Sequence, residues 1–269
     1  MIPSLIVLGM LGLIFGILLT LAHQRLKIEL NPLVEKIANL LPGLNCGACG
    51  YGKCSSLAEA IVKGEAEPDR CPATKPEIIG KIAKAIGKEI SLKEKKVARL
   101  LCAGGEKNAK KSFLYRGIKD CQAAVLIAEG NLLCKYGCLG LGSCALACPF
   151  EAIKMDENLL PVIDPEKCTG CGKCVETCPK GLLQLLPRSR KFLVACNSQD
   201  QGAATAKNCL VGCIGCQKCV KVCEPEAITV ENFLAKINPE KCNNCGKCVE
   251  VCPRGIIKMF NLLGDFPTV

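Results

Sequence analysis

Cysteine spacing constrains this chain more than any other feature of its sequence. Three cysteines at two-residue gaps, then a fourth before a proline, occur at residues 168–179 and again at residues 242–253. A near copy spans residues 213–225, where Glu224 separates the fourth cysteine from the proline. Three thiolates at that spacing can hold three corners of one [4Fe–4S] cube, while the fourth ligates a second cluster nearby. The sequence therefore predicts ferredoxin-type iron–sulfur units.

Composition excludes several other classes of protein. The 269 residues include 24 cysteines, but their tight grouping favours metal or cluster ligands over disulfides. The single histidine, His23, leaves no histidine-based catalytic triad or metal site. No glycine-rich dinucleotide fingerprint follows an expected strand, so we expect no NAD site on this chain and no catalytic residues of its own.

The N-terminus predicts a membrane anchor over residues 1–25. No charge occurs from Ile2 to Ala22, a stretch that would cover about 30 Å as a helix, the thickness of a bilayer core. Arg25 and Lys27 follow at once, and positive residues stay on the cytoplasmic side. We therefore expect a single-pass protein of the bacterial inner (plasma) membrane, with its bulk in the cytoplasm.

Residues 26–90 predict a small, mostly helical domain with one cluster. Apolar residues recur at helical spacing over 29–45, and helices are also expected over 55–64 and 75–92. Between them lie Cys46, Cys49, Cys54 and Cys71, enough for one [4Fe–4S] cluster. A four-cysteine zinc site is the alternative, although zinc sites usually use two separated cysteine pairs.

Residues 131–188 predict the first ferredoxin-like unit. Its first cysteine group has gaps of three, five and three residues, which departs from the bacterial run. A hairpin is expected from 152–155 and 160–163, and a strand is expected earlier in the chain, over 97–102, within the segment that precedes the unit. The two-cluster rule then gives one set made of Cys134, Cys138, Cys144 and Cys178. It gives a second set made of Cys148, Cys168, Cys171 and Cys174.

Residues 209–261 predict a second unit of the same kind, with a hairpin from 227–230 and 235–238. Its first set is Cys213, Cys216, Cys219 and Cys252. Its second set is Cys223, Cys242, Cys245 and Cys248. Residues 91–130 are expected to be a basic linker segment, 189–208 a linker between the units and 262–269 a tail. The expected fold is α+β, with the anchor, the small helical domain and two ferredoxin-like units of two short hairpins and two short helices each.

Four cysteines remain after five [4Fe–4S] clusters have been assigned. They are Cys102, Cys121, Cys196 and Cys209. One hypothesis is a sixth [4Fe–4S] cluster that joins the basic segment to the linker between the units. The alternative is buried free thiols, which behave as small apolar side chains.

Positive charge gathers in two places. Nine Lys or Arg and two Glu lie between Lys93 and Lys119, and Lys180, Arg188, Arg190 and Lys191 form a second group. An ordinary solvated surface and a docking site for a small acidic electron carrier both fit this pattern. Nucleic acid is not an expected partner, since no aromatic residues stand ready to stack on bases.

The ordered set of motifs resembles the B subunit family of the Rnf complex, a membrane-bound, ion-pumping ferredoxin:NAD oxidoreductase. The resemblance covers nearly the whole chain and rests on residues 45–50, 117–121, 136–144 and 212–216, together with the apolar N-terminus. It implies an electron-transfer subunit that accepts electrons from soluble reduced ferredoxin and passes them to partner subunits at the membrane. Because the Cys46 set lies nearest the anchor in the sequence, we expect electrons to leave there. An electron-transfer subunit of another membrane oxidoreductase is one alternative. A zinc-binding module for nucleic acid or lipid is another.

Overall fold

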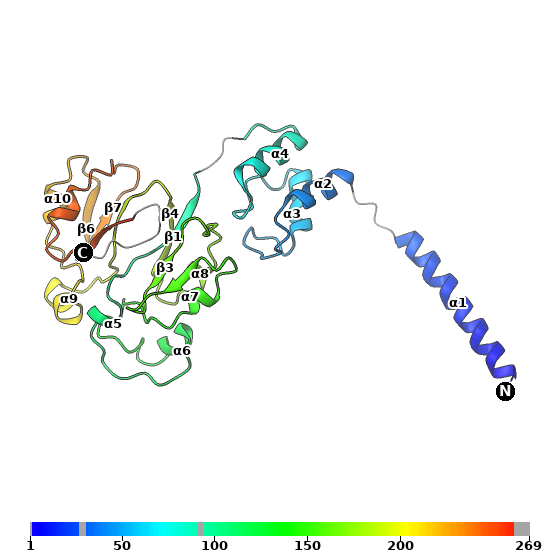
Figure 1. Cartoon of the computed structure of the whole chain (residues 1–269), viewed down its shortest axis with the longest axis horizontal. Coiled ribbons are helices and arrows are strands. Elements are labelled where there is room, and N and C mark those ends of the chain that lie inside the picture. Colours follow the sequence, from blue (N-terminus) through cyan, green and yellow to red (C-terminus); the bar gives the residue numbers. More distant parts are fainter. Residues whose placement is uncertain (1, 27–30, 91–93, 261–269) are drawn as a thin grey trace.

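The computed structural model describes residues 2–26, 31–90 and 94–260. Helix α1 (Ile2–Leu26) is followed by a small helical domain and then by the body that carries all the strands (Figure 1). Large apolar side chains of α1 such as Ile6, Leu13 and Leu19 are exposed. Nevertheless, none of the helices in the described ranges combines enough length and apolar character to cross a membrane. The predicted anchor is thus not confirmed by the structure.

The helical domain contains α2 (Pro32–Leu40), α3 (Cys54–Lys63) and α4 (Pro76–Ile86). Asn31 caps α2 by accepting a hydrogen bond from the Leu33 backbone N–H, and Gly64 and Gly87 end the other two helices in the left-handed conformation. The apolar stripes of the helices pack together around Ile37, Leu57, Ile61 and Ile82. The three predicted helices are confirmed, although α4 ends earlier than expected.

The first ferredoxin-like unit contains two two-stranded sheets. The predicted hairpin is β2 (Ile153–Met155) with β3 (Pro161–Ile163). The other sheet pairs β1 (Lys96–Leu100) with β4 (Leu183–Pro187) in antiparallel register, so strands from the two ends of the unit close it. Two short helices, α7 (Ser143–Leu146) and α8 (Lys173–Thr177), lie within the cysteine runs, and each contains the third cysteine of its run. The predicted strand at 97–102 is therefore part of this unit.

The second unit repeats this topology. Strands β6 (Ile228–Glu231) and β7 (Leu234–Ile237) form the hairpin, and β5 (Phe192–Val194) pairs with β8 (Ile257–Met259). The short helices are α10 (Lys218–Lys221) and α11 (Lys247–Glu250). The expectation of two hairpins per unit was wrong, because the second sheet of each unit pairs distant strands. Segments 91–130 and 189–208 each contribute one of those strands and do not simply connect domains.

Each unit carries an insertion after its first strand. The first insertion contains α5 (Gly105–Asn108) and α6 (Cys121–Val125), and the second contains α9 (Gly202–Asn208). Backbone hydrogen bonds join the two: Lys110 N–H donates to the Asn208 carbonyl and Leu210 N–H donates to the Asn108 carbonyl, both at 2.9 Å. The insertions therefore link the two ferredoxin-like units.

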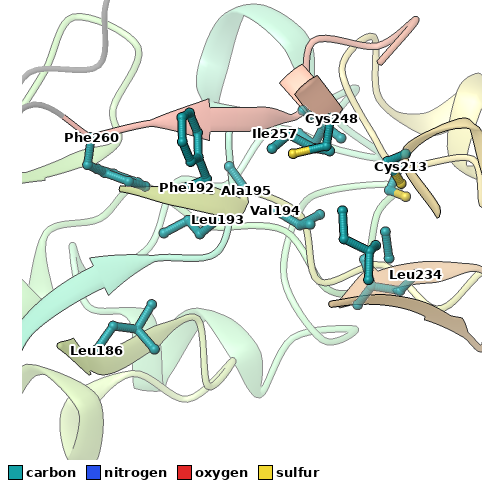
Figure 2. Close-up of a cluster of buried hydrophobic side chains, with 14 residues drawn as sticks. Leu186, Phe192, Leu193, Val194, Ala195, Cys213, Leu234, Cys248, Ile257 and Phe260 are labelled. Carbon is teal, nitrogen blue, oxygen red and sulfur yellow. The ribbon is translucent and has the colours of Figure 1, made fainter. Parts of the chain in front are cut away.

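The apolar core of the second unit extends to the first. Phe192, Leu193, Val194 and Ile257 form its centre, and Leu186 of β4 belongs to the same cluster (Figure 2). A separate cluster around Val97, Leu100 and Leu182 fills the first unit. Burial of apolar side chains on both sides of the boundary favours a fixed arrangement of the two units.

Candidate iron–sulfur sites

The ligand loops are shaped by glycine and by backbone amides that point at sulfur. Gly170 has φ +72°, and a Cβ there would lie 2.5 Å from the Lys96 carbonyl oxygen, so the loop needs glycine. Ala98 N–H donates to the Cys168 sulfur at 3.5 Å, and Leu182 N–H donates to the Cys178 sulfur at 3.4 Å. Such donors stabilise negative charge on a ligand sulfur and raise the reduction potential of a bound cluster.

Three of the sets expected in the ferredoxin-like units come together in the structure. Cys148, Cys168, Cys171 and Cys174 line one cavity. Cys213, Cys216, Cys219 and Cys252 line another. The third set surrounds Cys248, whose pKa is raised by burial and by the charges of Cys242, Cys245 and Cys223. In each case the fourth cysteine comes from the other run of the same unit, as the two-cluster rule requires.

The remaining set of the first unit differs from the expected one by a single cysteine. Cys121, Cys138, Cys144 and Cys178 line a cavity, while Cys134 is absent from it. After burial, the charges of Cys121 and Cys178 are the next causes that raise the pKa of Cys144, which places all three close together. The backbone N–H of Cys121 also donates to Ser143 at 2.8 Å, which fixes α6 beside α7. Cys121 therefore stands where Cys134 was expected.

Cys134 belongs instead to a set at the junction of the two units. Cys102, Cys134, Cys196 and Cys209 line one cavity, which we call the central site. A Cβ on Gly104 would lie 3.6 Å from the sulfurs of both Cys102 and Cys209. The four leftover cysteines thus do not form a set by themselves, because Cys121 is replaced by Cys134. The extra residues in the first cysteine group signalled this exchange, since the three-residue gap between Cys134 and Cys138 separates two sites.

The central site touches an outer set on each side. The Cys213 backbone N–H donates to the Cys196 sulfur at 3.4 Å. On the other side, a hydrogen bond from the Cys138 backbone acts on the Cys102 thiol. Cys102 and Cys196 each lie two residues after the first strand of their unit, so the two halves of the site are built alike.

The N-terminal set also lines a cavity, together with apolar residues of the loop after α2 and of α3; its cysteines are Cys46, Cys49, Cys54 and Cys71. Asn45 accepts a hydrogen bond from the Cys54 backbone N–H at 2.8 Å. Arg70 donates to the Cys49 carbonyl at 3.0 Å. The sequence analysis missed Arg70, because Arg70 belongs to no recognisable motif and its only signal is its position next to Cys71.

Burial affects the thiols of these sets strongly. Burial, together with the charges of neighbouring cysteines, raises the pKa of Cys174 and of Cys196 to about 12. The pKa of Cys144 rises to about 11 for the same two reasons. Each set therefore gathers negative charge when its thiols ionise, and that charge needs a positive partner. The donor sets fit iron–sulfur clusters, because each offers four thiols. Across the described residues, no three ligand-type side chains lie close enough to hold a single metal ion.

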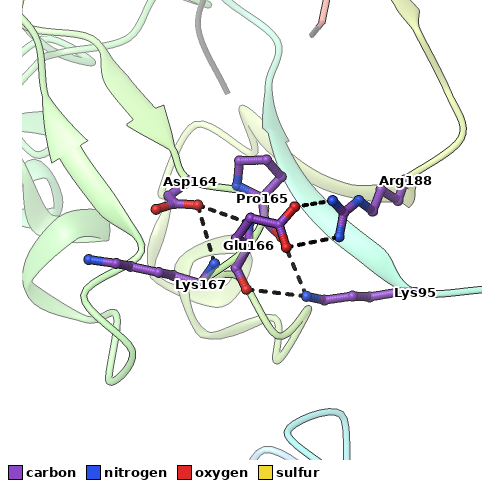
Figure 3. A network of polar contacts seen from close by, with 6 residues as sticks. All are labelled: Lys95, Asp164, Pro165, Glu166, Lys167 and Arg188. Atoms are coloured by element: carbon purple, nitrogen blue, oxygen red, sulfur yellow. Dashed lines mark hydrogen bonds and ion pairs between the residues drawn. The ribbon is translucent and has the colours of Figure 1, made fainter. Parts of the chain in front are cut away.

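A polar network positions the loop that leads to Cys168 (Figure 3). Arg188, just after β4, pairs with the Glu166 carboxylate, and Lys95 donates to the carbonyls of Pro165 and Glu166 at 3.4 Å. Asp164 accepts from the backbone N–H groups of Glu166 and Lys167, and its carbonyl accepts from Cys168 N–H at 2.9 Å. The network ties one end of the β1–β4 sheet, where β1 begins and β4 ends, to a ligand loop.

Several basic residues that were considered for docking have internal partners instead. Arg99 is only 4% exposed, and desolvation lowers its pKa while the nearby Cys168 opposes that shift. Arg190 is half-buried and donates to the Ile237 carbonyl. In contrast, Lys107, Lys119 and Arg116 of the first insertion are exposed. Only part of the predicted basic surface thus faces solvent.

Paired two-stranded sheets with crossed cysteine sets define an iron–sulfur protein of the ferredoxin type. Three family models agree with that class. One describes an Fe-S cluster and matches residues 41–73. A 4Fe-4S binding domain matches residues 161–184, and a 4Fe-4S dicluster domain matches residues 212–256.

Curated relatives are similar over most of the chain. The B subunit of the Na⁺-translocating ferredoxin:NAD⁺ oxidoreductase complex of Acetobacterium woodii is 43% identical over 88% of this chain and 71% of that protein. The B subunit of the ion-translocating oxidoreductase complex of Methanosarcina acetivorans is 41% identical over 90% of this chain and 92% of that protein. The B subunit of the proton-translocating ferredoxin:NAD⁺ oxidoreductase complex of Clostridium ljungdahlii is 44% identical over 88% of this chain and 84% of that protein.

The chain belongs to the family of B subunits of the ion-translocating oxidoreductase (Rnf) complexes. The resemblance noted from the sequence is thereby confirmed. Membership of this family decides against the zinc-binding module considered above.

Proposed function

We propose that the chain is the iron–sulfur subunit that carries electrons from reduced ferredoxin to the membrane partners of an ion-translocating ferredoxin:NAD oxidoreductase. The observation that carries this proposal is the series of four-cysteine sets, two of which meet the central site. The relatives named above are subunits of such complexes. The complex is a translocase-type oxidoreductase associated with the membrane, and this chain contributes electron transfer to it.

Six [4Fe–4S] clusters are proposed as cofactors. When bound, each supplies a one-electron redox centre whose potential depends on hydrogen bonds to sulfur and on nearby charge. The proposed N-terminal ligands are Cys46, Cys49, Cys54 and Cys71. The ligands of the first unit are Cys121, Cys138, Cys144 and Cys178, with Cys148, Cys168, Cys171 and Cys174. Those of the central site are Cys102, Cys134, Cys196 and Cys209. Those of the second unit are Cys213, Cys216, Cys219 and Cys252, with Cys223, Cys242, Cys245 and Cys248.

Electrons are proposed to enter at the second unit. Cys216 and Cys245 are the two exposed cysteines of the chain, so their sets lie nearest to solvent. Exposed Lys218 and Lys221 follow Cys216 in the sequence and would attract an acidic donor, whereas Lys247 is paired with Glu224. Ferredoxin as that donor is part of the proposal.

The exit is proposed at the Cys46 set, in the domain that follows α1. We also propose that residues 1–25 anchor the chain in the bacterial inner membrane by a single pass. The support is the uncharged stretch from Ile2 to Ala22 and the exposed apolar side chains along α1. Placement of the bulk of the chain in the cytoplasm rests on Arg25 and Lys27.

Matched cysteine variants test the direction of transfer. Cys46→Ala should leave ferredoxin-dependent bleaching of the other clusters intact but abolish NAD⁺ reduction by the complex. Cys245→Ala should instead slow bleaching by ferredoxin, while chemical reduction by dithionite is unaffected at the remaining clusters. If Cys46→Ala prevented reduction by ferredoxin altogether, electrons would enter at the N-terminal domain and the proposed direction would be reversed.

A further inference from the structure

A cation follows the last ligand of each ferredoxin-like unit. Cys178 and Pro179 precede Lys180, and Cys252 and Pro253 precede Arg254. The two positions are equivalent in the repeated topology, since each lies just before the last strand of its unit. Both residues are partly buried, and each donates to two backbone carbonyls.

Lys180 joins the outer set of the first unit to the central site. Its Nζ donates to the carbonyl oxygens of Glu129 at 2.6 Å and Lys135 at 2.5 Å. Those two carbonyls lie on either side of Cys134, a central-site cysteine. Cys134 and Cys178 both exert a charge effect on Lys180, so the ammonium lies within electrostatic reach of both sets.

Arg254 has the corresponding position in the second unit. Its Nη2 donates to the carbonyl of Cys209 at 2.7 Å, and its Nε donates to the carbonyl of Gly212 at 3.3 Å. Cys209 is a central-site cysteine, and Gly212 directly precedes Cys213 of the outer set. One guanidinium therefore holds the short segment that connects the two sets.

We propose that Lys180 and Arg254 are a matched pair of positioning residues, one at each junction between the central site and an outer site. Each fixes a ligand-bearing segment of the central site through two backbone carbonyls. Each also places a positive charge where two sets of thiolates would otherwise repel each other. This inference rests on the central cluster of the proposed function. Because a nearby cation favours the more negative, reduced form of a cluster, removal of either charge should lower the potential of the clusters at that junction.

The test uses Lys180→Met and Arg254→Met, which keep an apolar stem of similar length and remove the charge. Full-length protein, purified in detergent without oxygen, is titrated with reductant and followed by low-temperature EPR, and its iron is counted. The signal of the central cluster is identified as the one lost in Cys102→Ala. We expect that signal to move to lower potential in both Met variants, or to disappear together with about four iron atoms.

Conservative exchanges separate charge from shape. Lys180→Arg and Arg254→Lys each introduce the cation that the other unit uses. Unlike the Met variants, they should keep the parent protein's signal and iron content. Lys154→Met, at an exposed position on β2, is the matched control and should change neither. Met variants that titrate and bind iron as the parent protein does would overturn the inference, as would conservative exchanges that fail to keep the signal and the iron. If instead Cys102→Ala removed no signal and no iron from the parent, the central cluster itself would be wrong.

Discussion

The guanidinium carbon of Arg99 lies 4.4 Å from the centroid of the Phe260 ring, so a buried cation of the first unit covers an aromatic ring at the end of the second. Phe260 N–H also donates to the Lys191 carbonyl at 2.7 Å, which holds the ring at the end of the β5–β8 pair. A desolvated cation–π contact stabilises by about 1–2 kcal/mol. The contact therefore helps to hold the two units in one arrangement.

Phe260→Leu should weaken the contact between the two units without leaving a large cavity at their boundary. The leucine keeps most of the apolar burial but loses the ring face, so local opening of β8 should become about 5–30 times more frequent. Hydrogen exchange of the β5 and β8 amides, read by mass spectrometry, measures the change. Phe233→Leu is the control, because Phe233 is 47% exposed. Equal exchange in Phe260→Leu and the parent protein would show that the contact does not stabilise the boundary.

The exchange of Cys121 and Cys134 between sites can be tested by counting iron in double variants. If Cys121 and Cys138 share a cluster, Cys121→Ala with Cys138→Ala should lose about four iron atoms in total. Cys134→Ala with Cys138→Ala should lose about eight, because the two residues then belong to different clusters. The opposite pattern would restore the assignment expected from the ferredoxin rule alone.

The sequence predicted most of the local structure but not the long-range strand pairs. Helices α2 to α4 and both hairpins follow from periodicity and from nearby turn residues, which are local signals. The pairing of β1 with β4 joins Leu100 to Leu183 across the whole first unit, and no local sequence pattern predicts this pairing. The same dependence on local signals explains why the sequence assigned Cys121 and Cys134 to the wrong sites. Motif spacing placed Cys134 with its neighbours in the sequence, whereas the insertion that carries α6 brings Cys121 to Cys144 from outside the motif.

The two units use the same turn before their second cysteine run, with different residues. Asp164 accepts hydrogen bonds from two backbone N–H groups ahead of Cys168, and Asn238 accepts one from Glu240 N–H at 2.9 Å ahead of Cys242. Asp164→Ala should lower the free energy of unfolding by about 1–3 kcal/mol, at about 0.5–1.5 kcal/mol for each lost bond. Asp164→Asn should keep nearly all of the stability, because asparagine serves the same purpose in the second unit. The rate at which a chelator removes iron measures the difference, and it should be higher for Asp164→Ala. Equal rates for the two variants would show that these hydrogen bonds do not stabilise the ligand loop.

The metal-free chain should become less stable as the solution is made alkaline. Burial raises the pKa of Cys174 and Cys196 to about 12, above the value of about 8.5 expected in an unfolded chain. The folded metal-free state therefore keeps protons that the unfolded state releases. The stability that these buried thiols contribute is complete below about pH 8.5 and declines as the pH rises toward 12.

Circular dichroism of iron-depleted protein, kept reduced and titrated from pH 7 to pH 10, measures this decline. Cluster-loaded protein is the control, because its ligands are already deprotonated and bound and should show no such loss over that range. Cys196→Ala removes one of the raised pKa values, so the metal-free variant should lose less stability than the metal-free parent between the same two pH values. A metal-free chain whose folded content stayed constant up to pH 10 would mean that the thiols are solvated, and the buried cavities described here would not persist without their clusters.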